Sequence, residues 1–216
     1  MKVIAFDLDD TLYKEIDFLR SAYREISSYL SCKFGIEDTF DLMMQFYYNG
    51  KNVFDEIKTR YCLTVSGDTL LEIYRNHFPD ISLNMDILKT LESLKERSYP
   101  MALISDGRTI TQKNKIKALG LQKYLNESLV IISEEFGSEK PTNTNYIYIQ
   151  NYFPNADFFY VGDNLKKDFI TANFLGWTTI CLLDNGLNIH KQDFNLSEEY
   201  LPKYTITSLF EILNII

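Results

Sequence analysis

Hydrophobic residues follow two different patterns along this chain, and the change between them divides it into segments. Residues 3–6 form a short apolar run that predicts a buried strand. Between residues 15 and 83 the apolar positions recur every three or four residues, which predicts a series of four helices. From residue 84 onward, apolar runs of strand length alternate with helical patterns. We therefore expect a helical unit inserted into a unit in which strands and helices alternate.

The alternating segment predicts four strands in addition to the first, at residues 100–104, 129–132, 158–161 and 178–183. Helices are expected between them, one capped by Asn84 and one starting with a capping box of Thr109 and Gln112. Residues 146–149 alternate as a strand would, but their place in the order of elements favours a helix. Residues 184–202 have no clear period and predict an irregular segment, and residues 206–216 predict a closing helix.

Five buried strands separated by helices predict an α/β fold. Because parallel neighbours need long crossover connections, this order indicates a doubly wound, mostly parallel, five-stranded Rossmann-like sheet with an inserted all-helical unit. The predicted α/β core domain comprises residues 1–14 and 84–216, and the helical domain comprises residues 15–83. Hinges between the two are expected near residues 13–15 and 82–84.

Polar clusters follow four of the predicted elements. Asp7, Asp9 and Asp10 follow the first strand, and three carboxylates this close repel each other unless a cation lies among them. Mg²⁺ is suited to that place, because it binds one or two carboxylates together with a substrate phosphate. The remaining clusters are Ser105-Asp106, Lys140-Pro141 and Gly162-Asp163. Ligands of such sheets bind outside the carboxyl ends of the strands, so we expect all four clusters to converge.

In their order and spacing these clusters resemble the four motifs of the haloacid dehalogenase (HAD) superfamily, in its phosphatase branch. The matching residues are Asp7-x-Asp9-x-Thr11, Ser105, Lys140-Pro141, and Gly162-Asp163 with Asp168 five residues later. The helical unit after the first motif resembles the cap of the subgroup that inserts its cap there. One departure is Asn143, which stands where relatives often have a second proline after the lysine.

The resemblance implies a role for each motif residue. Asp7 would be the nucleophile that forms an aspartyl-phosphate. Asp9 would act as general acid and base, and its backbone carbonyl would bind the metal. Ser105 and the backbone N–H of Asp106 would hold phosphate oxygens, and Lys140 would bridge Asp7 and the phosphate. The family's dehalogenases lack the aspartate at position 9, so its presence favours phosphate chemistry.

The fourth motif completes the implied metal site. Asp163 would bind the metal directly, and Asp168 would either bind it through water or orient Lys140, so the expected metal residues are Asp7, Asp9, Asp163 and Asp168. Each motif residue also has a purely structural interpretation, such as a turn cap for Asp7, a helix N-cap for Ser105, or a helix-dipole partner for Asp168. Asp10 is interpreted as a turn or solvent residue. His77 and His190 lie far from the motifs in sequence and are interpreted as incidental.

The composition of the chain argues against some classes of binding partner. The 216-residue chain has a net charge of −8, which argues against nucleic-acid polymers and anionic membranes as partners. Its three widely spaced cysteines form no CxxC pattern, and no signal peptide or apolar run of membrane-spanning length is expected, so the sequence predicts a cytoplasmic protein. A small phosphorylated metabolite is the expected partner, and the protein is expected to be a monomer or a homodimer.

The sequence therefore predicts a Mg²⁺-dependent phosphatase acting on a sugar phosphate or a nucleotide. A phosphomutase with the same motifs is one alternative, and a binding or regulatory protein that keeps the fold without turnover is another. Because every substrate presents its phosphate to the same motifs, selectivity is expected to come from the cap or from loops beside it. The turn at residues 47–51, with Tyr48 and Lys51, is either a substrate contact or an ordinary part of the cap.

Overall fold

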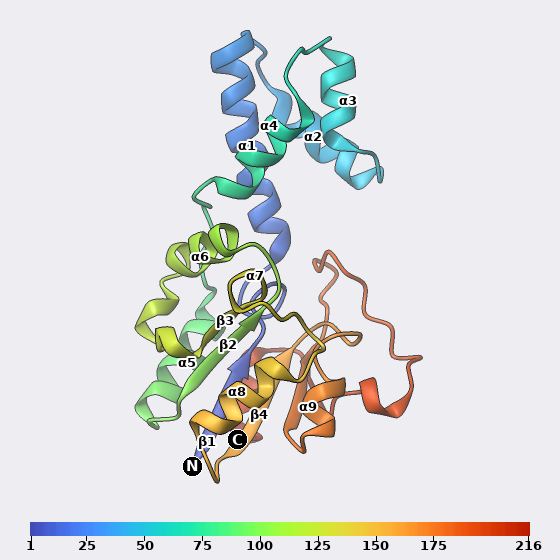
Figure 1. Ribbon diagram of the computed structural model, residues 1–216. Coiled ribbons are helices and arrows are strands. Elements are labelled where there is room, and N and C mark those ends of the chain that lie inside the picture. The colour runs from blue at the N-terminus through green and yellow to red at the C-terminus, as the bar shows by residue number, and fades with distance from the viewer.

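Six parallel strands form one sheet in the computed structural model, which describes residues 1–216 (Figure 1). The strands are β1 (Lys2–Phe6), β2 (Met101–Ser105), β3 (Val130–Ile132), β4 (Asp157–Gly162), β5 (Thr178–Leu182) and β6 (Tyr204–Ile206). Their order in the sheet is β3-β2-β1-β4-β5-β6, and every neighbouring pair is parallel. The predicted α/β class and parallel Rossmann-like sheet are confirmed.

Strand β1 lies in the middle of this sheet, between β2 and β4. Successive side chains of a strand point to opposite faces, and both faces are covered here, so residues 3–6 of the strand are all apolar. Ile4 and Phe6 pack into the hydrophobic cluster on one face, and Val3 and Ala5 pack into the cluster on the other. All four are fully buried. The central strand therefore ends at a well-fixed point, directly before Asp7.

Helices cover the two faces of the sheet in separate groups. On the face of Phe6 lie α5 (Met85–Glu96), α6 (Thr109–Ala118) and the 3₁₀ helix η4 (Leu209–Asn214). On the opposite face lie α8 (Thr144–Tyr152) and α9 (Ile170–Phe174). The short elements are η1 (Leu121–Lys123), η2 (Glu127–Leu129), α7 (Ser133–Phe136) and η3 (Glu198–Tyr200). The helix expected around residues 146–149 is confirmed as α8, and the side chain of Asn84 caps α5 as predicted.

Four helices form a separate bundle beyond the carboxyl edge of the sheet (Figure 1). They are α1 (Glu15–Phe34), α2 (Thr39–Tyr48), α3 (Val53–Arg60) and α4 (Gly67–Asn76). The bundle has its own hydrophobic cluster, which includes Leu19, Ile26, Met43 and Ile57. The helical character predicted for residues 15–83 is therefore present, while the domain boundaries stay a prediction.

The structure differs from the sequence-based expectation in three places. A sixth strand, β6, occupies residues 204–206, and only a 3₁₀ helix follows it where a closing α-helix was expected. Unlike β3, this edge strand has no apolar run, because Tyr204 and Thr205 are exposed, so β6 left no signal. Helix α9 is shorter than the predicted residues 166–175. The expected capping box at Thr109 is also absent, because the side chain of Gln112 turns inward to Asp9 and Ser105.

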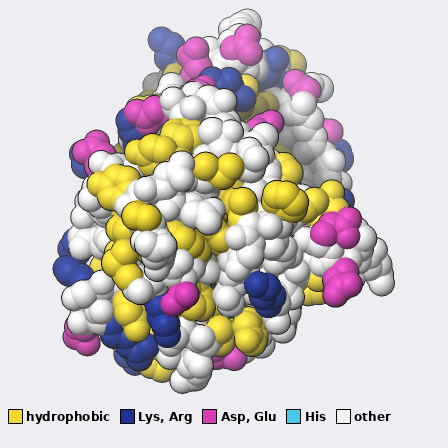
Figure 2. All heavy atoms as spheres, turned by 60° about the horizontal axis from the view of Figure 1, so that its bottom comes forward, with side chains coloured by type: hydrophobic (Ala, Val, Ile, Leu, Met, Phe, Trp, Pro, Cys, Tyr) yellow, Lys and Arg dark blue, Asp and Glu magenta, His cyan; other side chains and the backbone are white.

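The surface on the far side of the molecule from the helical bundle α1–α4 has a mixed composition, with no single type of side chain covering all of it. Figure 2 shows the molecule with the lower end of Figure 1 brought forward, and hydrophobic side chains there lie mainly among uncharged polar side chains and backbone, with most charged side chains nearer the edges of the view. Lysine and arginine gather in one small group near an edge of this view. None of the helices has the length and apolar character needed for a membrane span.

Candidate active site

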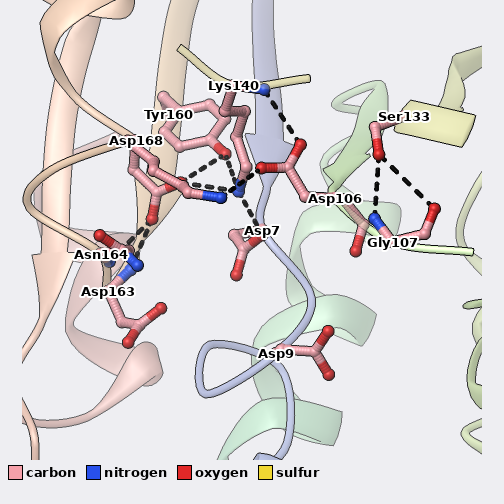
Figure 3. Close-up of polar contacts among 12 residues, drawn as sticks. Asp7, Asp9, Asp106, Gly107, Ser133, Lys140, Tyr160, Asp163, Asn164 and Asp168 are labelled. Atoms are coloured by element: carbon pink, nitrogen blue, oxygen red, sulfur yellow. Dashed lines mark hydrogen bonds and ion pairs between the residues drawn. The ribbon is translucent and has the colours of Figure 1, made fainter. Parts of the chain in front are cut away.

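The predicted motif residues meet at the carboxyl edge of the sheet. Asp7 follows β1, and its backbone N–H donates to the carbonyl oxygen of Val161 in β4 at 2.9 Å. Asp163 follows β4 directly, and Lys140 comes from the loop between α7 and α8. Figure 3 shows Asp7, Lys140 and Asp168 close together, with Asp163 beside them. The residues that follow the strands are therefore close together in the folded chain, as expected.

Lys140 is the centre of an ion-pair network. Its Nζ lies 2.5 Å from Asp7 Oδ1 and 2.7 Å from Asp168 Oδ1, and all three side chains are buried. Although burial disfavours the charge of this lysine, the carboxylates of Asp168 and Asp7 hold its pKa well above the ordinary value. Asp106 fixes the loop itself, because its Oδ1 accepts the backbone N–H of Lys140 at 3.0 Å. Lys140 is therefore a fixed positive charge beside Asp7.

Asp168 is fully occupied by contacts within the protein. Oδ1 accepts from Lys140, and Oδ2 accepts the backbone N–H groups of Asp163 at 3.1 Å and Asn164 at 2.8 Å. The side chain is completely buried. These contacts hold Lys140 and shape the loop after β4. Orienting Lys140 is one of the two roles that the sequence left open for Asp168, and the choice between them stays a prediction.

The approach of Asp168 to that loop requires Gly162. A Cβ atom added at position 162 would lie 2.4 Å from Asp168 Oδ2 and 2.7 Å from its carboxyl carbon. We expect Gly162→Ala to displace Asp168, to lower the free energy of unfolding by about 1–3 kcal/mol, and to reduce activity more than this loss of stability explains. Thermal unfolding and turnover of the variant would measure both effects. The control is Gly67→Ala, because a Cβ there meets only Lys58 Nζ at 3.9 Å.

Three carboxyl groups form a compact acidic cluster that suits a divalent cation. Carboxylate oxygens of Asp7, Asp163 and Asp168 all lie within 4.8 Å of one another. Burial and the neighbouring charges of Asp7 and Asp168 raise the pKa of Asp163 to about 9. Burial likewise raises the pKa of Asp7 to about 7, although Lys140 opposes the rise. The ammonium group of Lys140 therefore does not compensate all the negative charge of these three carboxyl groups. Their oxygens are hard donors, which are the ligands that Mg²⁺ prefers.

Asp9 is held apart from this cluster by residues that the sequence analysis did not identify. Its carboxylate accepts hydrogen bonds from Tyr13 Oη, from Gln112 Nε2 at 2.9 Å and from Lys115 Nζ at 2.7 Å. In Figure 3 the carboxyl group of Asp9 points away from Asp7 and Asp163. Burial by itself raises the pKa of Asp9, but Lys115, Tyr13 and Gln112 together bring that pKa below its ordinary value. The structure therefore favours the carboxylate form of Asp9.

Lys115 comes from α6 and is buried, with its Nζ 4.4 Å from the ring centroid of Phe18. We expect Lys115→Met to leave Asp9 without its cation, to raise the pKa of Asp9, and to lower turnover at neutral pH by about 10- to 100-fold. The acid limb of the kcat/KM profile should move to higher pH, and Lys115→Arg should keep part of the activity. Lys113→Met is the matched control, because Lys113 is on the same helix but pairs with Glu135 at the surface. A profile unchanged in Lys115→Met would contradict the effect on Asp9.

Ser105 and Asp106 occupy different environments. Ser105 is buried at the end of β2, and its Oγ accepts a hydrogen bond of 2.6 Å from Gln112 Nε2. Asp106 lines the pocket above the acidic cluster, where its Oδ2 pairs with Lys167 Nζ at 3.2 Å. Both residues lie at the predicted edge of the sheet, but in this arrangement Ser105 does not line the pocket itself.

A polar pocket of about 150 Å³ opens above these residues. No hydrophobic side chain lines it; the lining residues are Asp7, Asp9, Asp10, Glu15, Asp106, Lys140, Asp163, Asn164, Lys167 and His190. His190 thus lies on the wall of this pocket, although it is far from the motifs in sequence. Asp10 is buried, so it is not a solvent residue, although its φ of 58° fits a turn. Asp10 and the segment before His190 come together across 179 residues of sequence, and hydrophobic periodicity does not reveal contacts between such distant residues.

The proposed turn at residues 47–51 takes part in contacts within the cap. Tyr48 is 63% exposed, and its Oη accepts a long hydrogen bond of 3.4 Å from Arg20. Lys51 pairs with Glu56 at 3.1 Å. Together with Tyr23, Phe54 and other apolar side chains, Tyr47 and Lys51 line a separate groove on the cap. Contact between this turn and a substrate stays a prediction.

The family model for haloacid dehalogenase-like hydrolases matches residues 4–182, which include all four motifs and the cap. The chain belongs to the haloacid dehalogenase-like hydrolase family. The family predicted from Asp7-x-Asp9, Lys140 and Gly162-Asp163 is therefore confirmed.

Named relatives within this family are phosphatases. The glyceraldehyde 3-phosphate phosphatase of Methanocaldococcus jannaschii is 28% identical over 229 residues, covering 100% of this chain and 97% of the relative. The ribulose-1,5-bisphosphate 5-phosphatase of Halopiger xanaduensis is 32% identical, covering 53% of this chain and 46% of the relative. The predicted class of enzyme, a phosphatase-type hydrolase of the haloacid dehalogenase family, is confirmed at this level.

The solved structures agree on the fold. The magnesium-bound HAD-hydrolase YfnB from Bacillus subtilis superposes with a TM-score of 0.69 at 19% identity, covering 99% of this chain and 97% of that one. At this identity the likeness concerns the fold alone.

Proposed function

We propose that this protein is a Mg²⁺-dependent phosphatase that hydrolyses a small phosphorylated sugar through an aspartyl-phosphate on Asp7. The observation that carries the proposal is the position of Asp7, fixed at the end of the central strand, 2.5 Å from Lys140 and within an acidic cluster under a polar pocket. The sugar-phosphate class is supported by the names of relatives that act on glyceraldehyde 3-phosphate and ribulose 1,5-bisphosphate.

In the first half of the reaction an oxygen of Asp7 attacks phosphorus, and the bond between phosphorus and the leaving oxygen breaks. Lys140, which is already paired with Asp7, holds that carboxylate in place and offsets charge on the phosphate oxygens. Asp7 and Asp163 would hold the magnesium ion, together with the backbone carbonyl of Asp9. The ion would supply positive charge to the phosphate oxygens. Asp168 keeps Lys140 oriented throughout, because its own oxygens are occupied.

In the second half a water molecule attacks the phosphorus of the aspartyl-phosphate and releases Asp7. Asp9 lines the same pocket, and its carboxylate would turn from Lys115 toward that water to take its proton. Its lowered pKa favours the carboxylate form that can do so. In the first half the same group donates a proton to the leaving oxygen. A dianionic phosphate bound beside Asp9 raises the pKa of that carboxyl group and thereby supports protonation before transfer.

A phosphate-release screen tests this proposal. The purified protein would be incubated with a panel of sugar phosphates, nucleotides and acetyl phosphate, with magnesium present and with it removed. We expect inorganic phosphate from at least one sugar phosphate, only in the presence of magnesium. Isomerised sugar phosphate without free phosphate would indicate a phosphomutase, and binding without any release would indicate a non-catalytic member of the fold.

A further inference from the structure

The irregular segment after β5 folds into an ordered loop at the mouth of the pocket. Its first residue, Asp184, accepts three backbone N–H groups with one carboxylate oxygen, from Gly186 at 2.7 Å and from Leu187 and Asn188 at 3.0 Å each. At its other end Gln192 closes the loop, accepting the N–H of Asp184 and donating to the carbonyl oxygen of Leu182. Residues 184–192, here named the β5 loop, are therefore fixed by their own contacts.

Further contacts attach the β5 loop to the active site and to the start of the cap. Asn188 Nδ2 donates to Asp163 Oδ2 at 2.9 Å, and its Oδ1 accepts from Lys14 Nζ at 2.6 Å. The backbone N–H of Ile189 donates to Asp10 Oδ2 at 3.0 Å, and the Ile189 side chain packs against the hydrophobic cluster of the cap. The residue that follows, His190, is exposed and is thereby placed on the wall of the polar pocket.

Glu15, the first residue of cap helix α1, belongs to the same pocket lining. Its backbone N–H donates to Asp10 Oδ1 at 2.9 Å, so Asp10 ties together Glu15 and the β5 loop. The Glu15 carboxylate, in contrast, makes no hydrogen bond and no ion pair within the protein, although the side chain is partly buried. A partly buried acid without a partner, beside a pocket for a substrate, is available to contact that substrate.

We propose that Glu15 and His190 select the leaving group of the substrate, favouring a short neutral group with hydroxyl or carbonyl oxygens and disfavouring one that carries a carboxylate. This inference rests on the proposed phosphatase function. A hydroxyl group can donate to Glu15, and the imidazole of His190 can donate to a hydroxyl or carbonyl oxygen. The absence of hydrophobic side chains from the pocket lining agrees with a hydrated, polar leaving group.

Charge is the reason for the discrimination. Six carboxyl side chains line the pocket, and both of its lysines are already paired, Lys140 with Asp7 and Asp168, and Lys167 with Asp106. The charges of a bound magnesium ion and a phosphate dianion largely offset each other. The carboxylates of the pocket would therefore still repel a carboxylate on the leaving group. Burial, with the charge of Asp9 adding to it, raises the pKa of Glu15 to about 8, so the substrates are compared above that pH, where Glu15 is ionised.

Two substrates of equal size test the inference. Glyceraldehyde 3-phosphate and 3-phosphoglycerate differ only in an aldehyde against a carboxylate, and their ratio of kcat/KM measures the discrimination. We expect the wild type to prefer the aldehyde by at least about 10-fold, the lower end for one well-placed contact. Glu15→Gln should reduce this ratio several-fold, mainly by improving turnover of 3-phosphoglycerate. His190→Ala should raise KM for the aldehyde by about 10-fold with a smaller change in kcat.

Glu25→Gln serves as the matched control, because Glu25 is exposed on the same helix and its loss removes the same charge. It should leave the ratio unchanged. Should Glu15→Gln fail to fold, the wild-type ratio and His190→Ala still decide the question. Release from both substrates with a ratio near one, or a ratio that Glu15→Gln and His190→Ala leave unaltered, would overturn the inference alone. No release from any substrate, acetyl phosphate included, would overturn the proposed function and the inference with it.

Discussion

Replacing Asp7 by asparagine should abolish phosphate release while the protein still folds. The amide has almost the same shape as the carboxyl group but does not attack phosphorus, and loss of a nucleophile costs about 10⁴- to 10⁶-fold in kcat. Folding should survive because Lys140 keeps its second partner, Asp168, at 2.7 Å. Steady-state phosphate release and circular dichroism on the same preparation would measure the two properties separately.

Asp157→Asn provides the control for this experiment. Asp157 begins β4 at the opposite edge of the sheet, and it is exposed. Its replacement should change neither turnover nor folding. A fluoride analogue of the transferring phosphate should bind the wild type in the presence of magnesium and protect it against thermal unfolding. Turnover of Asp7→Asn at the wild-type rate would contradict the assignment of the nucleophile.

Removing magnesium with a chelator should also abolish activity, and Asp163→Asn should come close to the same result. The carboxyl groups of Asp7, Asp163 and Asp168 lie within 4.8 Å of one another, with Lys140 as the cation that pairs with two of them. A phosphate dianion approaching Asp7 is repelled unless a further cation lies between them. Phosphate release measured against added magnesium should show full recovery for the wild type and a much weaker response for Asp163→Asn.

Recovery on adding magnesium back is the internal control, because it separates loss of the ion from damage to the protein. Hydrolysis that continues undiminished in the chelator would mean that Lys140 alone offsets the charge of the phosphate. In that case the acidic cluster would need another explanation, such as a purely structural role for Asp163.

The sequence by itself determined the features of the fold that depend on local patterns of hydrophobic and polar residues. An apolar run such as Val3 to Phe6 has no polar position, so it indicates a strand covered on both faces. Parallel strands end at one edge of a sheet, so the polar residues that follow them must meet there. For this reason the sequence alone places Asp7, Lys140 and Asp163 together, and their pattern indicates the family that the comparison confirms.

Only the tertiary structure decided which side chains surround those motifs. Lys115 contacts Asp9 across 106 positions of sequence, and Ile189 contacts Asp10 across 179. Such contacts depend on how α6 and the β5 loop pack against the edge of the sheet, and hydrophobic periodicity carries no information on that. The sequence at the start of α6 also predicts a capping box, but in the folded chain the side chain of Gln112 donates to Asp9 instead.

The same limit applies to Asp168 and His190. The sequence left open whether Asp168 binds a metal or orients a lysine. Its hydrogen bonds to the loop after β4, which the absence of a side chain at Gly162 makes possible, come only from the folded chain. His190 lies in a segment without period, and its place in the pocket depends on the hydrogen bonds of Asp184, Asn188 and Gln192. Local pattern indicates where the chemistry lies, because strand ends are a local property. Long-range packing decides what surrounds it, because those neighbours come together only when the whole chain has folded.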